Sequence, residues 1–294
     1  MELEMMPGTY VLAVSGGVDS VVLLDMLRQQ KGIGLVVAHF DHGIRTDSKE
    51  DQTFVEALAI KYGLKFYSKI AKLGPNASEA LAREKRYNFL EQTRQQVSAL
   101  AIITAHHQDD ILETAILNLL RGTGRRGLSS LRSTDKIIRP LLPLTKADIL
   151  AYAKSHNLTW REDSTNNDEK YLRNYVRRQI IPKLSPTKRD ELLDIVTKAQ
   201  SSNQVIDEIL QQAIEGKVLK SEMNRQWFIC LPHATAKEVM ATWLLKNSVE
   251  LDRRRIEELV LASKTLAANK QRDIDAGHIL KIKTDKLALV SRER

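Results

Sequence analysis

The sequence predicts an α/β protein: a doubly wound, mainly parallel sheet followed by a second, smaller and mainly helical domain. In the first part of the chain, short apolar runs alternate with stretches of helical periodicity, which implies parallel strands joined by crossover helices. Pro182 and the polar stretch Ser185–Lys188 interrupt this alternation, and helical periodicity dominates beyond them. We therefore expect domains at residues 1–185 and 186–294.

The predicted elements of the first domain follow from local periodicity. Strands are expected where apolar residues run together, at Tyr10–Val14, Leu35–Phe40, Phe66–Ile70, Leu100–Ala105 and Ile137–Leu142. Helices are expected where apolar residues recur on one face, after Ser20 and at Ser48–Tyr62, Ala77–Gln95, Asp109–Leu120 and Thr145–His156. Asn76 and Glu79 have the spacing of a capping box, and Thr145 is the expected cap of the last helix.

The second domain carries fewer chemical signals. Its sequence predicts helices and then short strands in the alternating C-terminal stretch, with the helices at Asp190–Ile214, His233–Lys246 and Asp252–Lys264. Trp227 and Trp243 fit a hydrophobic core better than a platform for stacking bases.

The composition of the chain limits its function classes. Of 294 residues, 43% are hydrophobic and 28% are charged, as in a globular protein with a full core. The net charge of +8 favours a polyanionic partner. The single cysteine, Cys230, excludes an internal disulfide and fits a reducing compartment. Because the N-terminus lacks a basic signal region and no apolar run approaches the ~20 residues of a membrane span, we expect a cytoplasmic protein without membrane association.

The segment Val11–Ser20 (VLAVSGGVDS) predicts an anion site. A buried strand breaks into Ser15–Gly17, where adjacent glycines permit backbone angles that a Cβ resists and let a ligand approach the main chain. Asp19 or Ser20 can cap the following helix, whose free N–H groups and dipole favour an anion. The common P-loop pattern GxxxxGK(S/T) does not occur, and no lysine lies beside the turn. The segment resembles the SGGxDS signature of ATP-pyrophosphatases, the PP-loop; an ordinary strand-to-helix turn is the alternative.

A second motif, Ala105–Thr114 (AHHQDDILET), pairs carboxylates with histidines. Asp110 and Glu113 are three residues apart, so they share a helix face near the predicted anion site. Carboxylates beside a triphosphate suit Mg²⁺ or a substrate cation. Acids favoured by the helix dipole are the alternative, although the dipole does not explain the adjacent His106 and His107. A zinc site is less favoured, because neighbouring histidines rarely reach one metal.

Polar residues follow three of the predicted strands, in SGGVDS, DHGIR and AHHQDD. Ligands of doubly wound sheets lie at the carboxyl ends of the strands, so these segments are expected to converge on one crevice. Arg45 of DHGIR is suited to meet a phosphate there, although a polar turn around Gly43 explains this segment equally well.

Two basic segments complete the pattern. Arg121–Arg132 (RGTGRRGLSSLR) combines glycines with arginines, as a phosphate-binding loop does; a solvated basic loop is the alternative. Tyr171–Arg178 (YLRNYVRR) places Arg173 and Arg177 four residues apart on one helical face, after the long polar loop Arg161–Asp168.

These motifs, together with EALAREKRYNFL, RPLL and EDSTN, occur in the order typical of the tRNA(Ile)-lysidine synthetase family, which the chain resembles over about residues 9–183. SGGxDS is shared with the whole ATP-pyrophosphatase superfamily, whereas RGTGRRGLSSL and RN-x-x-R are more specific. The second domain resembles the family's helical tRNA-binding domain. The resemblance implies a short form without the extra C-terminal domain of longer members.

The resemblance implies a reaction. The C2 oxygen of the wobble cytidine in an isoleucine tRNA with a CAU anticodon is adenylated by ATP, and pyrophosphate leaves. The ε-amine of free L-lysine then displaces AMP and forms lysidine, which changes codon reading from AUG to AUA and charging from methionine to isoleucine. Mg²⁺ is the implied cofactor, and a homodimer is the implied assembly.

The resemblance also implies roles for particular residues. The expected ATP ligands are Ser15, Gly16, Gly17, Val18, Asp19 and Ser20. The expected catalytic residues are Asp19, His106, Asp110 and Glu113, with His106 neutralising charge on the α-phosphate. Asp110 and Glu113 are expected to bind lysine, and Asp19 with Asp110 to hold Mg²⁺. The expected tRNA-binding residues are Arg83, Arg86, Arg125, Arg126, Arg173 and Arg177. Of these, Arg83 and Arg86 are suited to hold the cytidine or phosphates.

Two alternative functions stay open. A tRNA thiolase of the same superfamily would need cysteines to carry sulfur or an iron–sulfur cluster, and Cys230 stands alone in the second domain. Amide-forming relatives that use ammonia lack the basic glycine-rich run. A non-catalytic nucleotide- or RNA-binding module would keep the glycine turn but would not need Asp110, Glu113 and the double histidine together.

Overall fold

The computed structural model describes residues 5–43, 48–71, 73–74, 78–129, 131–161, 172–249 and 251–292. The chain forms two compact units. Unit 1 comprises Met1–Leu117 and Ser130–Leu193, and unit 2 comprises Asn118–Ser129 and Asp194–Arg294. This division differs from the expected boundary between residues 185 and 186 because helix α8 (Pro186–Ile214) runs through it. Its first apolar positions pack in unit 1 and its last in unit 2.

A parallel sheet forms the centre of unit 1, and the predicted doubly wound architecture is confirmed. Its strands, in the spatial order β3-β2-β1-β4-β5, are β1 (Gly8–Ala13), β2 (Ile33–Asp41), β3 (Lys65–Ile70), β4 (Ala101–Ile103) and β5 (Ile137–Ile138). The chain builds outward from β1 in one direction through β2 and β3, and in the other through β4 and β5. The order therefore reverses between β1 and β4, where a doubly wound sheet opens a ligand crevice.

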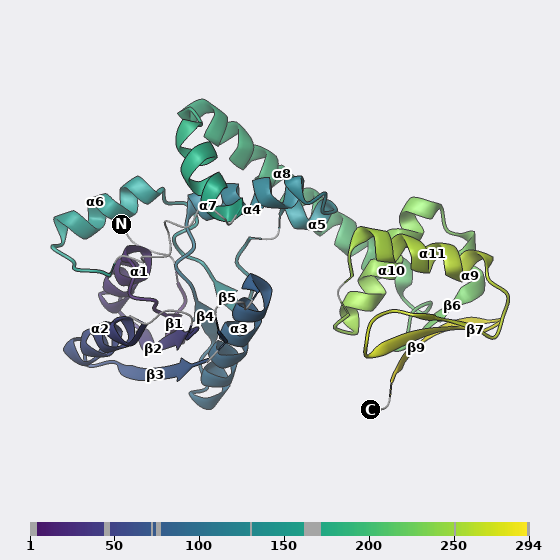
Figure 1. Cartoon of the computed structure of the whole chain (residues 1–294), viewed down its shortest axis with the longest axis horizontal. Helices are drawn as coiled ribbons and strands as arrows, with labels where there is room; N and C mark the ends of the chain where they lie inside the picture. The colour runs from purple at the N-terminus through teal and green to yellow at the C-terminus, as the bar shows by residue number, and fades with distance from the viewer. Residues whose placement is uncertain are drawn as a thin grey trace. The chain divides into compact units, whose positions relative to one another are not determined.

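Helices cover both faces of this sheet (Figure 1). The bounds in unit 1 are α1 (Val18–Arg28), α2 (Ser48–Lys61), α3 (Glu79–Gln96), α4 (Gln108–Leu120, which ends in unit 2), α6 (Lys146–Ser155) and α7 (Leu172–Tyr175). A π-helical turn (Val176–Ile180) and a 3₁₀ turn (Ile181–Lys183) follow α7. Helices α1, α2 and α6 share one core with the sheet, and α3 packs on the opposite face.

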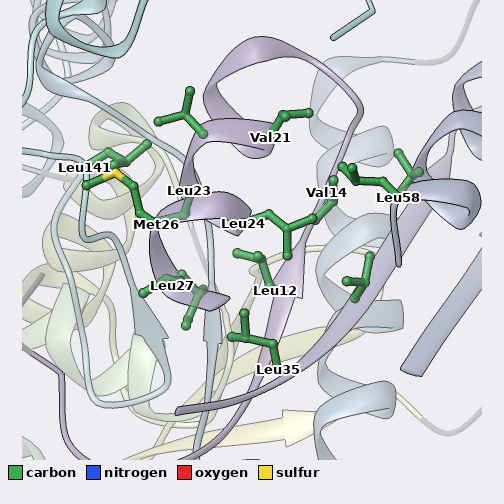
Figure 2. Close-up of a cluster of buried hydrophobic side chains, with 14 of the residues drawn as sticks. Leu12, Val14, Val21, Leu23, Leu24, Met26, Leu27, Leu35, Leu58 and Leu141 are labelled. Carbon is green, nitrogen blue, oxygen red and sulfur yellow. The ribbon is translucent and has the colours of Figure 1, made fainter. Parts of the chain in front are cut away.

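Strand β1 contributes to both cores because its side chains alternate in direction. Leu12 is buried with α1 on one face, whereas Val11 is buried with α3 on the other. Figure 2 shows Leu24 and Leu27 of α1 beside Leu12. Each fully buried leucine contributes roughly 1.5–3 kcal/mol through the hydrophobic effect. This packing holds β1 and α1 together and so stabilises the turn that joins them.

Two predicted helix caps have different outcomes. The Thr145 cap of α6 is confirmed: Thr145 and Asp148 form a complete capping box. The capping box of Asn76 and Glu79 is wrong, because α3 begins at Glu79 and Ser78 is its cap, accepting a hydrogen bond from the Leu81 N–H at 3.2 Å. Ser78 directly precedes the first helical residue, so its hydroxyl reaches the third N–H of the helix. Asn76 itself lies outside the described residues.

Unit 2 combines helices with a small antiparallel sheet. Its strands, in the order β6-β9-β8-β7, are β6 (Glu222–Asn224), β7 (Lys270–Asp273), β8 (His278–Ile282) and β9 (Lys286–Ser291). Besides the end of α8, its helices are α5 (Arg125–Leu128), α9 (Arg225–Cys230), α10 (His233–Lys246) and α11 (Arg253–Thr265). The predicted core role of the tryptophans is confirmed: Trp243 is fully buried and Trp227 packs against the same cluster. In the part of the chain that is described, no helix is both long and apolar enough to cross a membrane.

Candidate active site

The turn after β1 is preformed by its own hydrogen bonds. Gly16 has a φ of +95°, which only glycine adopts without strain. Gly17, with a φ of −72°, is the N-cap of α1, and no side chain caps this helix. The predicted cap at Asp19 or Ser20 is therefore wrong. The Ser20 hydroxyl instead donates to the Gly17 carbonyl at 2.9 Å and accepts from the Ser15 N–H at 3.2 Å, so it closes the turn on itself.

A cavity of about 400 Å³ opens beside this turn, within the size range of small-molecule sites. Its walls come from the ends of β1, β2 and β4, from the start of α1, and from α2 and α3. Its polar lining residues are Ser15, Asp19, Ser20, His39, Asp41, His42, Asp51, Arg86, Thr104 and His106. The predicted convergence of the three polar strand ends is thus confirmed, although Arg45 lies outside the described residues.

His106 lies in the cavity as a neutral imidazole. Its Nδ1 is 2.9 Å from the Thr104 hydroxyl. Burial lowers the pKa of His106 to about 3, and the positive charges of Arg139 and Arg86 oppose its protonation further. At neutral pH His106 therefore offers a hydrogen bond rather than the positive charge that was expected of it, and a role at the α-phosphate stays a prediction.

His107 brings Asp19 and Asp110 together. The Asp109 N–H donates to Nδ1 of this buried ring at 3.3 Å, so Nε2 is the ring nitrogen that faces the two carboxylates. Nε2 lies 3.6 Å from an Asp110 oxygen and 3.9 Å from an Asp19 oxygen. Carboxylates are hard oxygen donors of the kind Mg²⁺ prefers, but among the described residues no three His, Cys, Asp or Glu side chains are grouped to hold a metal ion, so Mg²⁺ at Asp19 and Asp110 stays a prediction.

Arg177 binds two carboxylates of α4, Asp110 and Glu113. Its guanidinium binds Glu113 through two hydrogen bonds of 2.5 and 2.9 Å and reaches Asp110 at 3.2 Å. Glu113 is only 2% exposed, and burial raises its pKa. Asp110 and Glu113 thus share one cation, the Arg177 guanidinium, and their binding of Mg²⁺ or lysine stays a prediction. The sequence analysis assigned Arg177 to tRNA, and no local signal indicated its pairing with Glu113.

Arg86 lines the cavity, and Arg83 and Arg139 lie close enough to His106 to act on its charge. Arg83 and Arg86 of α3 lie over the Tyr87 ring, with centroid distances of 4.9 and 5.3 Å. Arg139, which the sequence analysis did not assign, is 6% exposed. Burial lowers the pKa of both Arg86 and Arg139. Positive charges held in this partly desolvated setting favour an anion in the cavity.

The other predicted tRNA ligands are placed differently. Arg125 lies in unit 2, where it pairs with Asp207 at 2.7 Å and with Glu238 at 2.9 Å. Arg126 pairs with the same Asp207 at 2.8 Å. Arg173 lies in α7. Contact of these arginines with RNA stays a prediction, and the structure shows that the first two also hold their own unit together.

Two residues to which the sequence analysis gave no role contact the turn between β1 and α1. Lys146 at the start of α6 places its ammonium 2.5 Å from Asp19 Oδ1. Arg161 donates its backbone N–H to the Gly16 carbonyl at 3.0 Å, and its guanidinium binds Glu50 and Asp51 of α2. Neither contact leaves a local signal, because the partners are more than 100 positions apart.

A model of the PP-loop domain family matches residues 4–184, which include β1, its glycine turn and the cavity. The chain belongs to the PP-loop family, whose domain binds ATP.

The chain is also similar to curated proteins that are named tRNA(Ile)-lysidine synthase. The tRNA(Ile)-lysidine synthase of Thermotoga maritima is 35% identical, over 72% of this chain and 54% of the relative. That of Thermus thermophilus is 44% identical, over 59% of this chain and 35% of the relative. That of Francisella tularensis subsp. holarctica is 29% identical, over 96% of this chain and 74% of the relative. The matched part of this chain thus spans about half, or less, of the length of the first two relatives.

Proposed function

We propose that this chain ligates L-lysine to C2 of the wobble cytidine in an isoleucine tRNA with a CAU anticodon, using ATP and forming lysidine. The observation that carries the proposal is the pair of carboxylates, Asp110 and Glu113, holding a guanidinium beside a preformed PP-loop. A site for a cationic amine next to a site for phosphate is what joining lysine to an adenylated base requires. Relatives named tRNA(Ile)-lysidine synthase match up to 96% of the chain.

In the first step, the C2 oxygen of cytidine attacks the α-phosphate of ATP and pyrophosphate leaves. The backbone N–H groups around Gly16 and Gly17 and the start of α1 bind the phosphates, because these donors and the helix dipole favour anions. Arg86 adds positive charge from the cavity wall. Asp19 and Asp110 would hold Mg²⁺, which offsets the negative charge of the triphosphate.

In the second step, the ε-amine of lysine attacks C2 and AMP leaves. The amine must first lose a proton, and a carboxylate with a raised pKa accepts a proton more readily. Glu113 has such a pKa because it is buried. Arg177 already neutralises this carboxylate in the structure, so lysine binding requires the two cations to share or exchange Asp110 and Glu113. A cytoplasmic location, expected from the sequence, and a homodimer, implied by the resemblance, accompany this proposal as predictions.

The first test is incorporation of labelled L-lysine into a CAU-anticodon isoleucine tRNA transcript, with and without ATP. We expect incorporation that requires ATP and vanishes when the wobble cytidine is replaced. The Asp110→Ala variant should abolish incorporation while keeping RNA affinity, because it removes one of the two carboxylates at the amine site. Asp135→Ala, in an exposed loop of the same unit, is the matched control.

Other results would select another function. Pyrophosphate release that depends on RNA, without lysine incorporation, would keep adenylation and exclude lysine as the nucleophile. Nucleotide and RNA binding without turnover would favour the non-catalytic module. Full activity of Asp110→Ala would contradict the assignment of the carboxylates.

A further inference from the structure

The start of α6 supplies a lysine to a phosphate turn that has none of its own. The common P-loop carries a lysine directly after its glycines, and this lysine binds the terminal phosphates of the nucleotide. The turn from Ser15 to Ser20 contains no lysine. In the structure, Lys146 reaches Asp19 of this turn from 127 positions away, with Nζ 2.5 Å from Oδ1.

The backbone of Lys146 is held firmly in place. Thr145 and Asp148 close the capping box directly around it. The Gln108 N–H, at the start of α4, donates to the Leu144 carbonyl at 2.9 Å and so ties this segment to the site. Ile149, in the next turn of α6, is fully buried in the core that α6 shares with α1. The lysine therefore has a fixed base beside the PP-loop.

The ammonium group of Lys146, in contrast, is free to exchange partners. The side chains of Lys146 and Asp19 are 37% and 29% exposed, and an ion pair with this much exposure contributes little to stability because water screens it. Its loss is therefore a small cost. A nucleotide phosphate offers a stronger charge-assisted hydrogen bond in the same region. The four-carbon stem of lysine allows a short displacement without moving the helix.

We propose that Lys146 is a ligand of the β- and γ-phosphates of ATP, and that Asp19 holds its ammonium at the turn until the nucleotide enters. Lys146 then moves from the Asp19 carboxylate to the phosphates, and this carboxylate becomes available to a divalent cation. The ammonium group of Lys146 is thus already at the turn before ATP binds, where the bound phosphates require a positive charge. The inference rests on the proposed use of ATP.

The test compares nucleotide binding by wild-type protein and Lys146→Met, with ATP, AMP and adenosine titrated by calorimetry without RNA. One lost charge-assisted hydrogen bond should weaken ATP binding roughly 10- to 100-fold. Affinity for AMP and adenosine should change less than about twofold, because neither carries the phosphates that Lys146 contacts. Mn²⁺ binding to the nucleotide-free protein should become tighter in Lys146→Met, because Asp19 loses its competing cation.

Two further variants separate this role from a structural one. Lys146→Arg retains a cation and should recover part of the lost ATP affinity. Lys154→Met, at an exposed position on the same helix, should bind ATP as the wild type does. Equal losses for ATP and AMP, or no loss for either, would overturn the inference and leave Lys146 as a tie between α6 and α1. Absence of ATP binding by the wild type would overturn the proposed function as well.

Discussion

The two glycines of the PP-loop have different physical roles. Gly16 adopts a φ of +95°, whereas Gly17 has a φ of −72°, which any residue tolerates. A Cβ on Gly17 would meet only the Ser15 hydroxyl, at 3.6 Å. Backbone strain therefore requires glycine at the first position alone. Glycine at the second position leaves room for a ligand to approach the main chain.

The matched variants Gly16→Ala and Gly17→Ala separate these roles. Gly16→Ala should lower the free energy of unfolding by about 1–3 kcal/mol, because alanine is strained at this backbone angle. Gly17→Ala should have a free energy of unfolding within about 0.5 kcal/mol of the wild type, and only its ATP affinity should fall. Urea unfolding and ATP titration measure the two effects. Equal stability of the two variants would contradict the assigned backbone strain.

Helix α3 carries an ion pair that links stability to pH. Arg94 donates to both oxygens of Glu91, at 2.8 and 2.7 Å, and these hydrogen bonds lower the pKa of Glu91 from 4.5 to about 2. The folded-state pKa is depressed, so the carboxylate stabilises the fold above pH 4.5, and this contribution is lost as the pH falls toward 2.

The Glu91→Gln variant tests this linkage. At pH 7 it should be less stable than the wild type by about 0.5–1 kcal/mol, the usual range for a partly exposed pair. The difference should shrink as the pH falls from 4.5 toward 2, because the wild-type carboxylate becomes protonated. Urea unfolding over this pH range measures the effect. Glu84→Gln, on the exposed side of the same helix, is the control, and a difference independent of pH would contradict the assigned ion pair.

The short helix α5 is attached to unit 2 mainly through arginine. Arg125 reaches Asp207 on α8 and Glu238 on α10, and also hydrogen-bonds Asn203. Arg125→Ala should therefore destabilise unit 2 by about 1–3 kcal/mol, since it leaves Glu238 without its arginine and removes one of the two arginines that bind Asp207. The measurement is urea-dependent hydrogen exchange of α10, which reports on unit 2 alone.

Arg121→Ala is the matched control for Arg125→Ala, because Arg121 is exposed in the same basic segment. It should change stability by less than about 0.5 kcal/mol. If Arg125→Ala were as stable as this control but weaker in RNA binding, Arg125 would be an RNA ligand rather than a structural residue.

For the whole molecule, the net charge of +8 favours binding to RNA, and this binding should weaken as salt is added. Each phosphate contact releases a counterion, so the logarithm of the binding constant should fall with a slope of about −0.7 to −0.9 per contact. Arg173→Ala should reduce this slope by roughly one. Affinity titrations over a salt series measure the change, with Lys154→Ala as control. An unchanged slope would place the RNA surface away from α7.

Arg177→Ala should behave differently from Arg173→Ala, although the two residues are four positions apart. The sequence places both on one face of an α-helix, but the chain turns into a π-helix at Val176, and Arg177 binds Glu113. Removal of Arg177 is therefore expected to affect the proposed binding of lysine at Glu113 more than the salt dependence of RNA binding.

Much of the architecture followed from local sequence alone. Apolar runs and helical periodicity predicted the parallel sheet, and α10 agrees with its predicted bounds at both ends. SGGVDS and AHHQDD indicated the site because strand ends meet at one edge of a parallel sheet. Backbone angles, helix periodicity and glycine requirements are properties of neighbouring residues. They can therefore be recognised without knowledge of the tertiary fold.

Which partner each charged side chain meets could be learned only from the folded structure. Asp19 meets Lys146 from 127 positions away, Glu113 meets Arg177 from 64, and Arg125 meets Glu238 from 113. A charged residue in a sequence has many candidate partners. Which one it meets is set by the packing of elements far apart in the chain. Local sequence therefore located the glycine turn and the carboxylates, whereas long-range packing determined which cations lie on Asp19 and Glu113.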